Sequence, residues 1–102
     1  MSILSTTLDT TATTIYQSSG ENVVTTLYFC NTSIAALTFN MYLVPNGGTA
    51  SQSNIVYYNV EIAPSDTYVV DLEKIMLDDG DKIQANTAIA GFIVSTISYM
   101  RY

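Results

Sequence analysis

The sequence of 102 residues contains no histidine, no tryptophan, one cysteine and only three basic residues. Without histidine, a Ser-His-Asp triad and a histidine-ligated zinc site are both excluded. Binding to nucleic acid needs clustered Lys and Arg to replace the counterions of the phosphates, and Lys74, Lys82 and Arg101 form no such patch. The same shortage, with a net charge of −6, argues against an anionic membrane surface. The sequence therefore predicts neither a nucleic-acid nor a membrane partner.

Two further absences concern redox chemistry and targeting. The single Cys30 has no partner for an internal disulfide, and its apolar neighbours predict a small buried hydrophobe instead of a reactive thiol. Residues 1–10 have neither the charged nor the apolar region of a secretory signal. No apolar run approaches the ~18 residues of a membrane-spanning helix. We expect a protein made in the cytoplasm of its host and not secreted.

What the chain does contain favours β-structure. Charged residues make up 12% of it, about half of the usual ~25%, while Thr, Ser and eight Tyr fill the remainder. Apolar and polar residues alternate in short segments separated by turn signals, at 14–17, 22–31, 37–44, 54–63, 66–72, 82–87 and 91–102. This pattern predicts one antiparallel β-sandwich of about seven to eight strands, immunoglobulin-like or jelly-roll. We expect residues 21–102 to form it, with 1–20 as an N-terminal arm or edge strand and one or two helical turns in 71–77.

The segment 22–31, NVVTTLYFCN, is apolar on both faces when it is read with a period of two. A sandwich strand normally buries one face and wets the other. Large apolar patches mark protein interfaces, where Tyr and Met are enriched, so the second face is expected to contact other chains. The predicted interface residues are Val24, Tyr28, Tyr42, Val44 and Tyr57. Two alternatives are isolated surface apolar residues, which are normal, and cover by the N-terminal arm.

Carboxylates gather around one glycine turn, at Asp78, Asp79 and Asp81, with Asp71 and Glu73 upstream. Ca²⁺ prefers such oxygen ligands, but the spacing of a helix-loop-helix calcium loop is absent and Asp-Gly is a common turn pair. A carboxylate pair for glycoside hydrolysis would also need a cleft, which so small a domain does not suggest. We expect a solvated turn, no metal, no cofactor, no catalytic residues and no enzyme activity.

The phrases NVVTTLYFCNTS, YLVPNGGTAS, NIVYYNVEIAPSDTYVVDLEKIMLDDGDKIQA and VSTISY follow one another between residues 22 and 99. In this order they resemble small β-sandwich structural proteins of tailed bacteriophages, including phages of cyanobacteria. The resemblance implies a virion component present in many copies. The expected role is a capsid decoration (cement) protein that binds other copies of itself, for which a trimer would suit a capsid lattice, and the major capsid protein or other virion proteins.

Two alternatives stay open at this point. The same fold serves in neck, tail, baseplate and fibre proteins, and a fold by itself does not show where in the virion a protein is located. Exposed tyrosines such as Tyr57 or Tyr58 could instead stack on sugars, which would make the chain a carbohydrate-binding adhesion module.

Overall fold

The computed structural model describes residues 2–70 and 75–101. Within these ranges the chain forms nine β-strands and no helix. The strands are β1 (Ser2–Thr7), β2 (Thr13–Gln17), β3 (Asn22–Asn31), β4 (Leu37–Val44), β5 (Ile55–Ile62), β6 (Thr67–Val70), β7 (Ile75–Leu77), β8 (Lys82–Thr87) and β9 (Ile93–Arg101).

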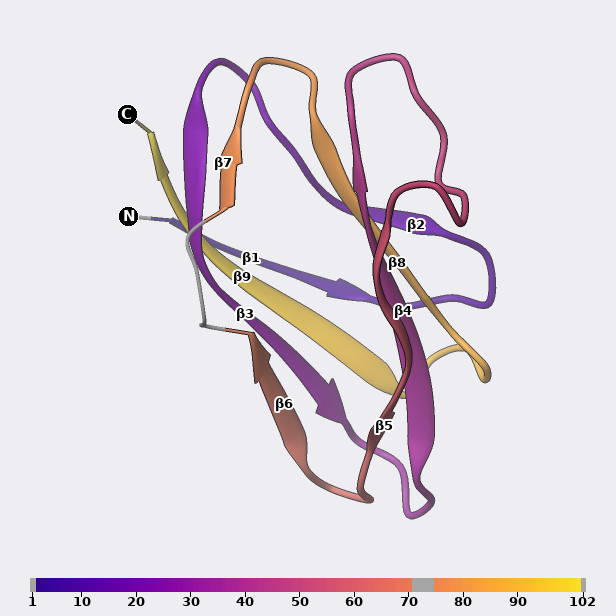
Figure 1. The fold of residues 1–102 in the computed structure, drawn as a ribbon. Coiled ribbons are helices and arrows are strands. Elements are labelled where there is room, and N and C mark those ends of the chain that lie inside the picture. The colour runs from indigo at the N-terminus through magenta and orange to yellow at the C-terminus, as the bar shows by residue number, and fades with distance from the viewer. Residues whose placement is uncertain (1, 71–74, 102) are drawn as a thin grey trace.

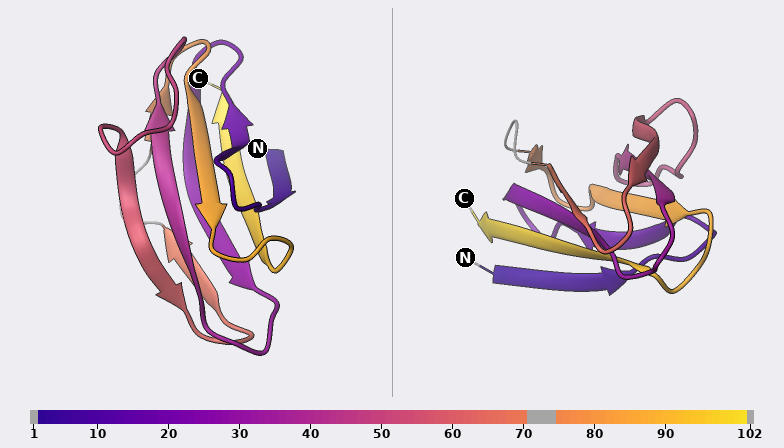
Figure 2. Two further views of the ribbon diagram at one scale, coloured as in Figure 1. Left: turned by 90° about the vertical axis from the view of Figure 1, so that its right-hand side faces the viewer. Right: turned by 90° about the horizontal axis from the view of Figure 1, so that it is seen from below.

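The strands form two antiparallel sheets packed face to face (Figures 1 and 2). The first sheet has the order β1-β9-β3-β6, and β7 pairs with the part of β3 that β6 leaves free. The second sheet has the order β2-β8-β4-β5. The predicted antiparallel β-sandwich is therefore confirmed, with nine strands in the described chain instead of seven to eight.

The helical turns predicted for 71–77 are wrong where the structure describes them. Ile75–Leu77 is β7, which pairs with Asn22–Val24 of β3. Leu77 is buried while Met76 is exposed, the alternation of a strand with one buried face. Pairing with β3 thus overrides the weak local preference for a helix. Residues 71–74 of the same prediction lie outside the described residues.

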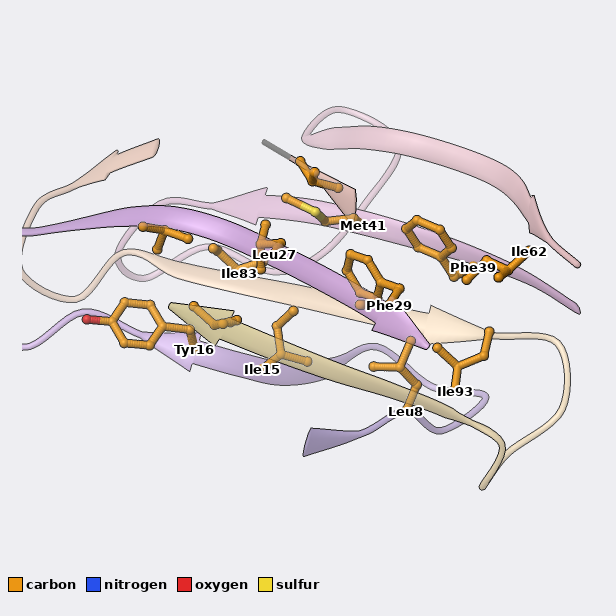
Figure 3. Packing of buried hydrophobic residues seen from close by; sticks show 14 of the residues in the cluster. Leu8, Ile15, Tyr16, Leu27, Phe29, Phe39, Met41, Ile62, Ile83 and Ile93 are labelled. Carbon is orange, nitrogen blue, oxygen red and sulfur yellow. The ribbon is translucent and has the colours of Figure 1, made fainter. Parts of the chain in front are cut away.

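The core lies between the two sheets (Figure 3). Phe29 of β3 and Phe39 of β4 stack across it with ring centroids 4.2 Å apart. Around them pack side chains from both sheets, among them Leu8, Ile15, Tyr16, Leu27, Met41, Ile62, Ile83, Ala85, Ile93 and Ile97. Leu8 and Ile15 are both 1% exposed, so the first twenty residues contribute to this core as well as to the sheet edges.

A β-bulge in β3 explains how one strand can be apolar on both faces in sequence. The register of β3 against β9 shifts between Val24 and Thr26. An extra residue in a strand reverses the direction of every later side chain relative to simple alternation. Val24, Leu27 and Phe29 consequently all point into the core, at 1%, 0% and 0% exposure.

Candidate functional site

The outer face of the five-stranded sheet is the most unusual surface of the described chain. The strand registers align its outward side chains in four rows. From one end to the other, these rows are Met76–Val23–Met100, Thr26–Ser98–Ile3, Val69–Tyr28–Thr96–Ser5 and Thr67–Cys30–Val94–Thr7. We call this set the uncharged face, because it contains no Asp, Glu, Lys or Arg.

Five apolar side chains on the uncharged face are open to solvent, whereas Val23 is only 8% exposed. Ile3 is 73% exposed, Met76 63%, Val69 44%, Met100 43% and Tyr28 40%. The residues between them are mostly Thr and Ser, which hydrogen bond within the sheet, as Ser5 Oγ does with Thr96 Oγ1 at 3.2 Å. A face of this composition can lose its water at little electrostatic cost, since no ionised group has to be desolvated.

The outer face of the second sheet is different in kind. Its side chains include amides that bond one another along the strands, with Asn40 Nδ2 donating to Asn86 Oδ1 at 2.8 Å. Gln84 Nε2 donates to Thr14 Oγ1 at 3.0 Å, and Glu61 lies beside β4 on the edge strand β5. This face also exposes Val56 and Tyr58 of β5, but amides and Glu61 lie among them, so the two sides of the sandwich are not equivalent.

Only part of the predicted interface set lies on the outside. Tyr28 stands in the middle of the uncharged face. Tyr42 is half-buried on the outer face of the second sheet, between Gln84 and Ile55 of the neighbouring strands. Whether Tyr28 and Tyr42 contact another chain stays a prediction.

The expectation that Val24 and Val44 are exposed is wrong. The β3 bulge turns Val24 into the core. Val44 is 2% exposed because the turn after β4 folds over it. Gly48 N donates to Pro45 O at 2.9 Å, and Val44 Cγ1 stands 3.4 Å from the position of a Cβ on Gly48.

Tyr57 also turns inward, because it lies opposite the buried Met41. Its ring packs against Phe39 and Tyr68, with centroid distances of 6.4 and 6.0 Å. Burial raises the pKa of the Tyr57 phenol above its ordinary value of 10.0, and the nearby Tyr68 raises it further. Tyr57 is therefore part of the inter-sheet packing, and the expectation that it faces outward is wrong.

A second apolar surface lies at the end of the sandwich where β3 joins β4 and β8 joins β9. There Ile34 is 97% exposed, Ile89 52% and Phe92 43%. With Thr32, Ser33, Ala35 and Leu37 they line a pocket of about 340 Å³. Asp, Glu, Lys and Arg are absent from both loops, 32–36 and 88–92. We call this surface the loop end.

The loop end is held in shape by hydrogen bonds, several of them made by the buried Asn31. Asn31 is 0% exposed, and its Nδ2 donates to Ala35 O at 2.8 Å and to Ile62 O at 3.1 Å. Its Oδ1 accepts from Ser33 N at 3.0 Å. Thr32 N and Thr32 Oγ1 both donate to Phe92 O at 2.8 Å, which ties the two loops together. Ile34 is thus exposed to solvent on a loop that these hydrogen bonds hold in one conformation.

Sequence reasoning missed the loop end, although a signal was present. The two loops and their flanking residues are identical at four of seven positions, NTSIAAL at 31–37 and NTAIAGF at 86–92. Each places an isoleucine in the middle of small residues. A comparison of the chain with itself over short windows would have drawn attention to both loops.

The predicted carboxylate cluster serves the turns. Asp81 Oδ1 accepts from Asn46 N at 3.0 Å and its Oδ2 from Asp78 N at 3.1 Å. Asp79 Oδ1 accepts from Gly20 N at 2.8 Å. Asp71 and Glu73 lie outside the described residues. Within residues 2–70 and 75–101, no group of three metal-ligating side chains could hold an ion.

Cys30 is half-buried on the uncharged face, which is a more open position than predicted. Across the described ranges, no helix is long and apolar enough to span a bilayer.

No protein-family model, curated protein or solved structure matches the chain. The resemblance to phage structural proteins therefore stays a prediction, and the surfaces described above are the basis for any functional proposal.

Proposed function

We propose that the chain is a non-enzymatic structural subunit of a tailed-phage virion, a capsid decoration protein that acts through contacts with other copies of itself and with the major capsid protein. The observation that supports this most is the uncharged face. Among the described side chains, one side of the sandwich carries exposed Tyr, Val, Ile and Met among Thr and Ser, with no charge.

The energetics favour protein contact at this face. Each large apolar side chain that is removed from water contributes on the order of 1.5–3 kcal/mol before the cost of association. The chain has a net charge of −6, and copies meeting through their charged loops would repel one another. Contact through the uncharged face avoids this repulsion.

The loop end offers a second contact, separated from the first. The proposed role involves two contacts, one with neighbouring copies and one with the major capsid protein. The exposed Ile34, Ile89 and Phe92 suit the contact with the shell, because a preorganised apolar loop loses little conformational entropy when it binds.

The test uses purified particles of the phage that encodes the chain. Quantitative mass spectrometry should give a copy number comparable with that of the major capsid protein. A copy number far below it would instead place the chain in the neck, tail, baseplate or fibre. Absence from purified particles would contradict a virion role altogether.

A matched pair of variants tests the surface itself. Tyr28→Glu puts a charge in the centre of the uncharged face, whereas Gln84→Glu puts the same charge on the outer face of the second sheet. Tyr28→Glu should abolish binding of the added protein to particles that lack it, and Gln84→Glu should bind as the unaltered chain does. Equal binding by both variants would exclude the uncharged face as the contact.

A further inference from the structure

Strand β1 is an open sheet edge with none of the usual protection against pairing. Edge strands expose unpaired backbone groups, and proteins normally block them with charge, proline, bulges or shortness. β1 spans Ser2–Thr7 and pairs with β9 in an unbroken register. It contains no charged residue, no proline and no bulge, and it lies at the outer margin of the first sheet (Figure 2).

The other edges in the described chain are all protected. β2 has a register shift between Thr14 and Tyr16. The register of β5 against β4 shifts at two points, and β5 carries a charge at Glu61. In addition, Asn59 of β5 has a φ of 50°, and its N–H donates to Asn40 Oδ1. β6 and β7 have only four and three residues. The contrast singles out β1 as the edge that can accept another strand.

The backbone groups that β1 presents to the open edge can be assigned. Leu8 N donates to Ile93 O at 2.8 Å and Leu8 O accepts from Gly91 N at 3.2 Å, so Leu8 continues the ladder with β9. In an antiparallel ladder, alternate residues bond the same neighbour. Leu4 and Thr6 therefore bond β9, and the N–H and C=O groups of Ile3, Ser5 and Thr7 point away from it.

We propose that β1 pairs antiparallel with β1 of a second copy. The two-fold axis passes perpendicular to the sheet at Ser5, so that Ser5 faces Ser5 and Ile3 faces Thr7 of the other copy. Each facing pair of this kind exchanges both of its hydrogen bonds, which uses all three open residues. The pairing joins the two sheets into one, with the two uncharged faces side by side.

A second copy fits this edge better than a foreign strand for two reasons. The pattern of open groups about Ser5 is symmetric, as a two-fold contact requires. β1 and the uncharged face next to it carry no charge, so that two acidic chains can approach here. Pairing also covers part of Ile3 and Leu4, which are 73% and 41% exposed. The inference shares with the proposed function only the requirement for self-association, and it predicts a two-fold pair instead of a trimer.

Disulfide trapping tests the register in the full chain with Cys30→Ala. Facing residues in a bonded antiparallel pair have Cα atoms ~5.5 Å apart, within the range that a disulfide spans. Ser5→Cys should therefore form a covalent dimer under mild oxidation, and Ser53→Cys in an exposed loop should not. Ile3→Cys and Thr7→Cys should cross-link when mixed but not alone. Cross-linking of Ser5→Cys no faster than Ser53→Cys would overturn the inference.

Ser5→Pro tests the contact without a new bond. Because the Ser5 N–H faces the open edge, proline there removes no bond to β9 and is tolerated on an edge strand. Sedimentation should show loss of the dimer, while circular dichroism shows that the monomer keeps its β-structure. A dimer that survives Ser5→Pro would overturn the edge pairing and leave self-association elsewhere. If cross-linking fails while the chain is still found on particles, the inference fails and the proposed function stands.

Discussion

Phe29 and Phe39 stack face to face across the sandwich, with their ring centroids 4.2 Å apart and their planes at 20°. One ring comes from each sheet, so this pair is a direct link between the two layers (Figure 3). Both side chains are 0% exposed. Phe39 also meets the ring of Tyr68 at 5.6 Å, which extends the aromatic cluster toward β6.

The first prediction concerns this link. Phe39→Ala should lower the free energy of unfolding by about 3–5 kcal/mol, because it removes buried area and leaves a cavity between the sheets. Tyr58→Ala is the control, since Tyr58 is 65% exposed and its loss should cost no more than about 0.5 kcal/mol. Urea unfolding followed by circular dichroism measures both. Similar losses for the two variants would contradict the core described for β4.

The second prediction concerns Asn31. Asn31→Asp replaces the amide donor that serves Ala35 O and Ile62 O with a carboxylate that faces two carbonyls. We expect a loss of at least about 1–3 kcal/mol in the free energy of unfolding. Faster hydrogen exchange in loop 32–36 should accompany it.

Asn86→Asp is the matched change for this test. Asn86 is half-buried and uses its Oδ1 as an acceptor from Asn40, a function that a carboxylate keeps. It should therefore unfold close to the unaltered chain. If Asn31→Asp lowered the free energy of unfolding no more than Asn86→Asp does, the hydrogen bonds of Asn31 would not be what holds the loop end in shape.

The third prediction compares two glycines with positive φ. Gly47 has φ +81 with nothing within 4 Å of an added Cβ, so Gly47→Ala should cost only the backbone strain of about 1–2 kcal/mol. Gly80 has φ +87, and its Cβ would meet the amide group of the exposed Asn46 side chain. Gly80→Ala should therefore cost the same backbone strain plus the displacement of this side chain, a modest further loss in thermal unfolding. The reverse order would be inconsistent with the packing of turn 78–81 on Asn46.

The fourth prediction follows from the raised pKa of Tyr57. Above the ordinary value of 10.0 the unfolded chain loses the Tyr57 proton while the folded chain retains it, so stability should be flat below this pH and fall as pH rises above it. In Tyr57→Phe this contribution is absent, and the decline above pH 10.0 should be shallower. Urea midpoints from neutral to alkaline pH measure it; parallel curves for the two proteins would mean that Tyr57 ionises as freely in the fold as outside it.

The sequence by itself determined the fold class, because period-two alternation and frequent turn signals in a chain rich in Thr, Tyr and Val leave an antiparallel sandwich as the way to bury one face of each strand. It also placed most charged residues outside the strands of the first sheet, where Arg101 at the end of β9 is the exception among the described residues. Which apolar residues stay outside was decided only by the tertiary structure. A single bulge after Val24 turned this predicted surface residue into the core, since one added residue reverses every later side chain. Val44 keeps its outward direction and is covered by the turn after β4. The open edge of β1 also follows from the tertiary structure, because only the order of the strands in the sheet shows that β1 has no second neighbour among the described strands.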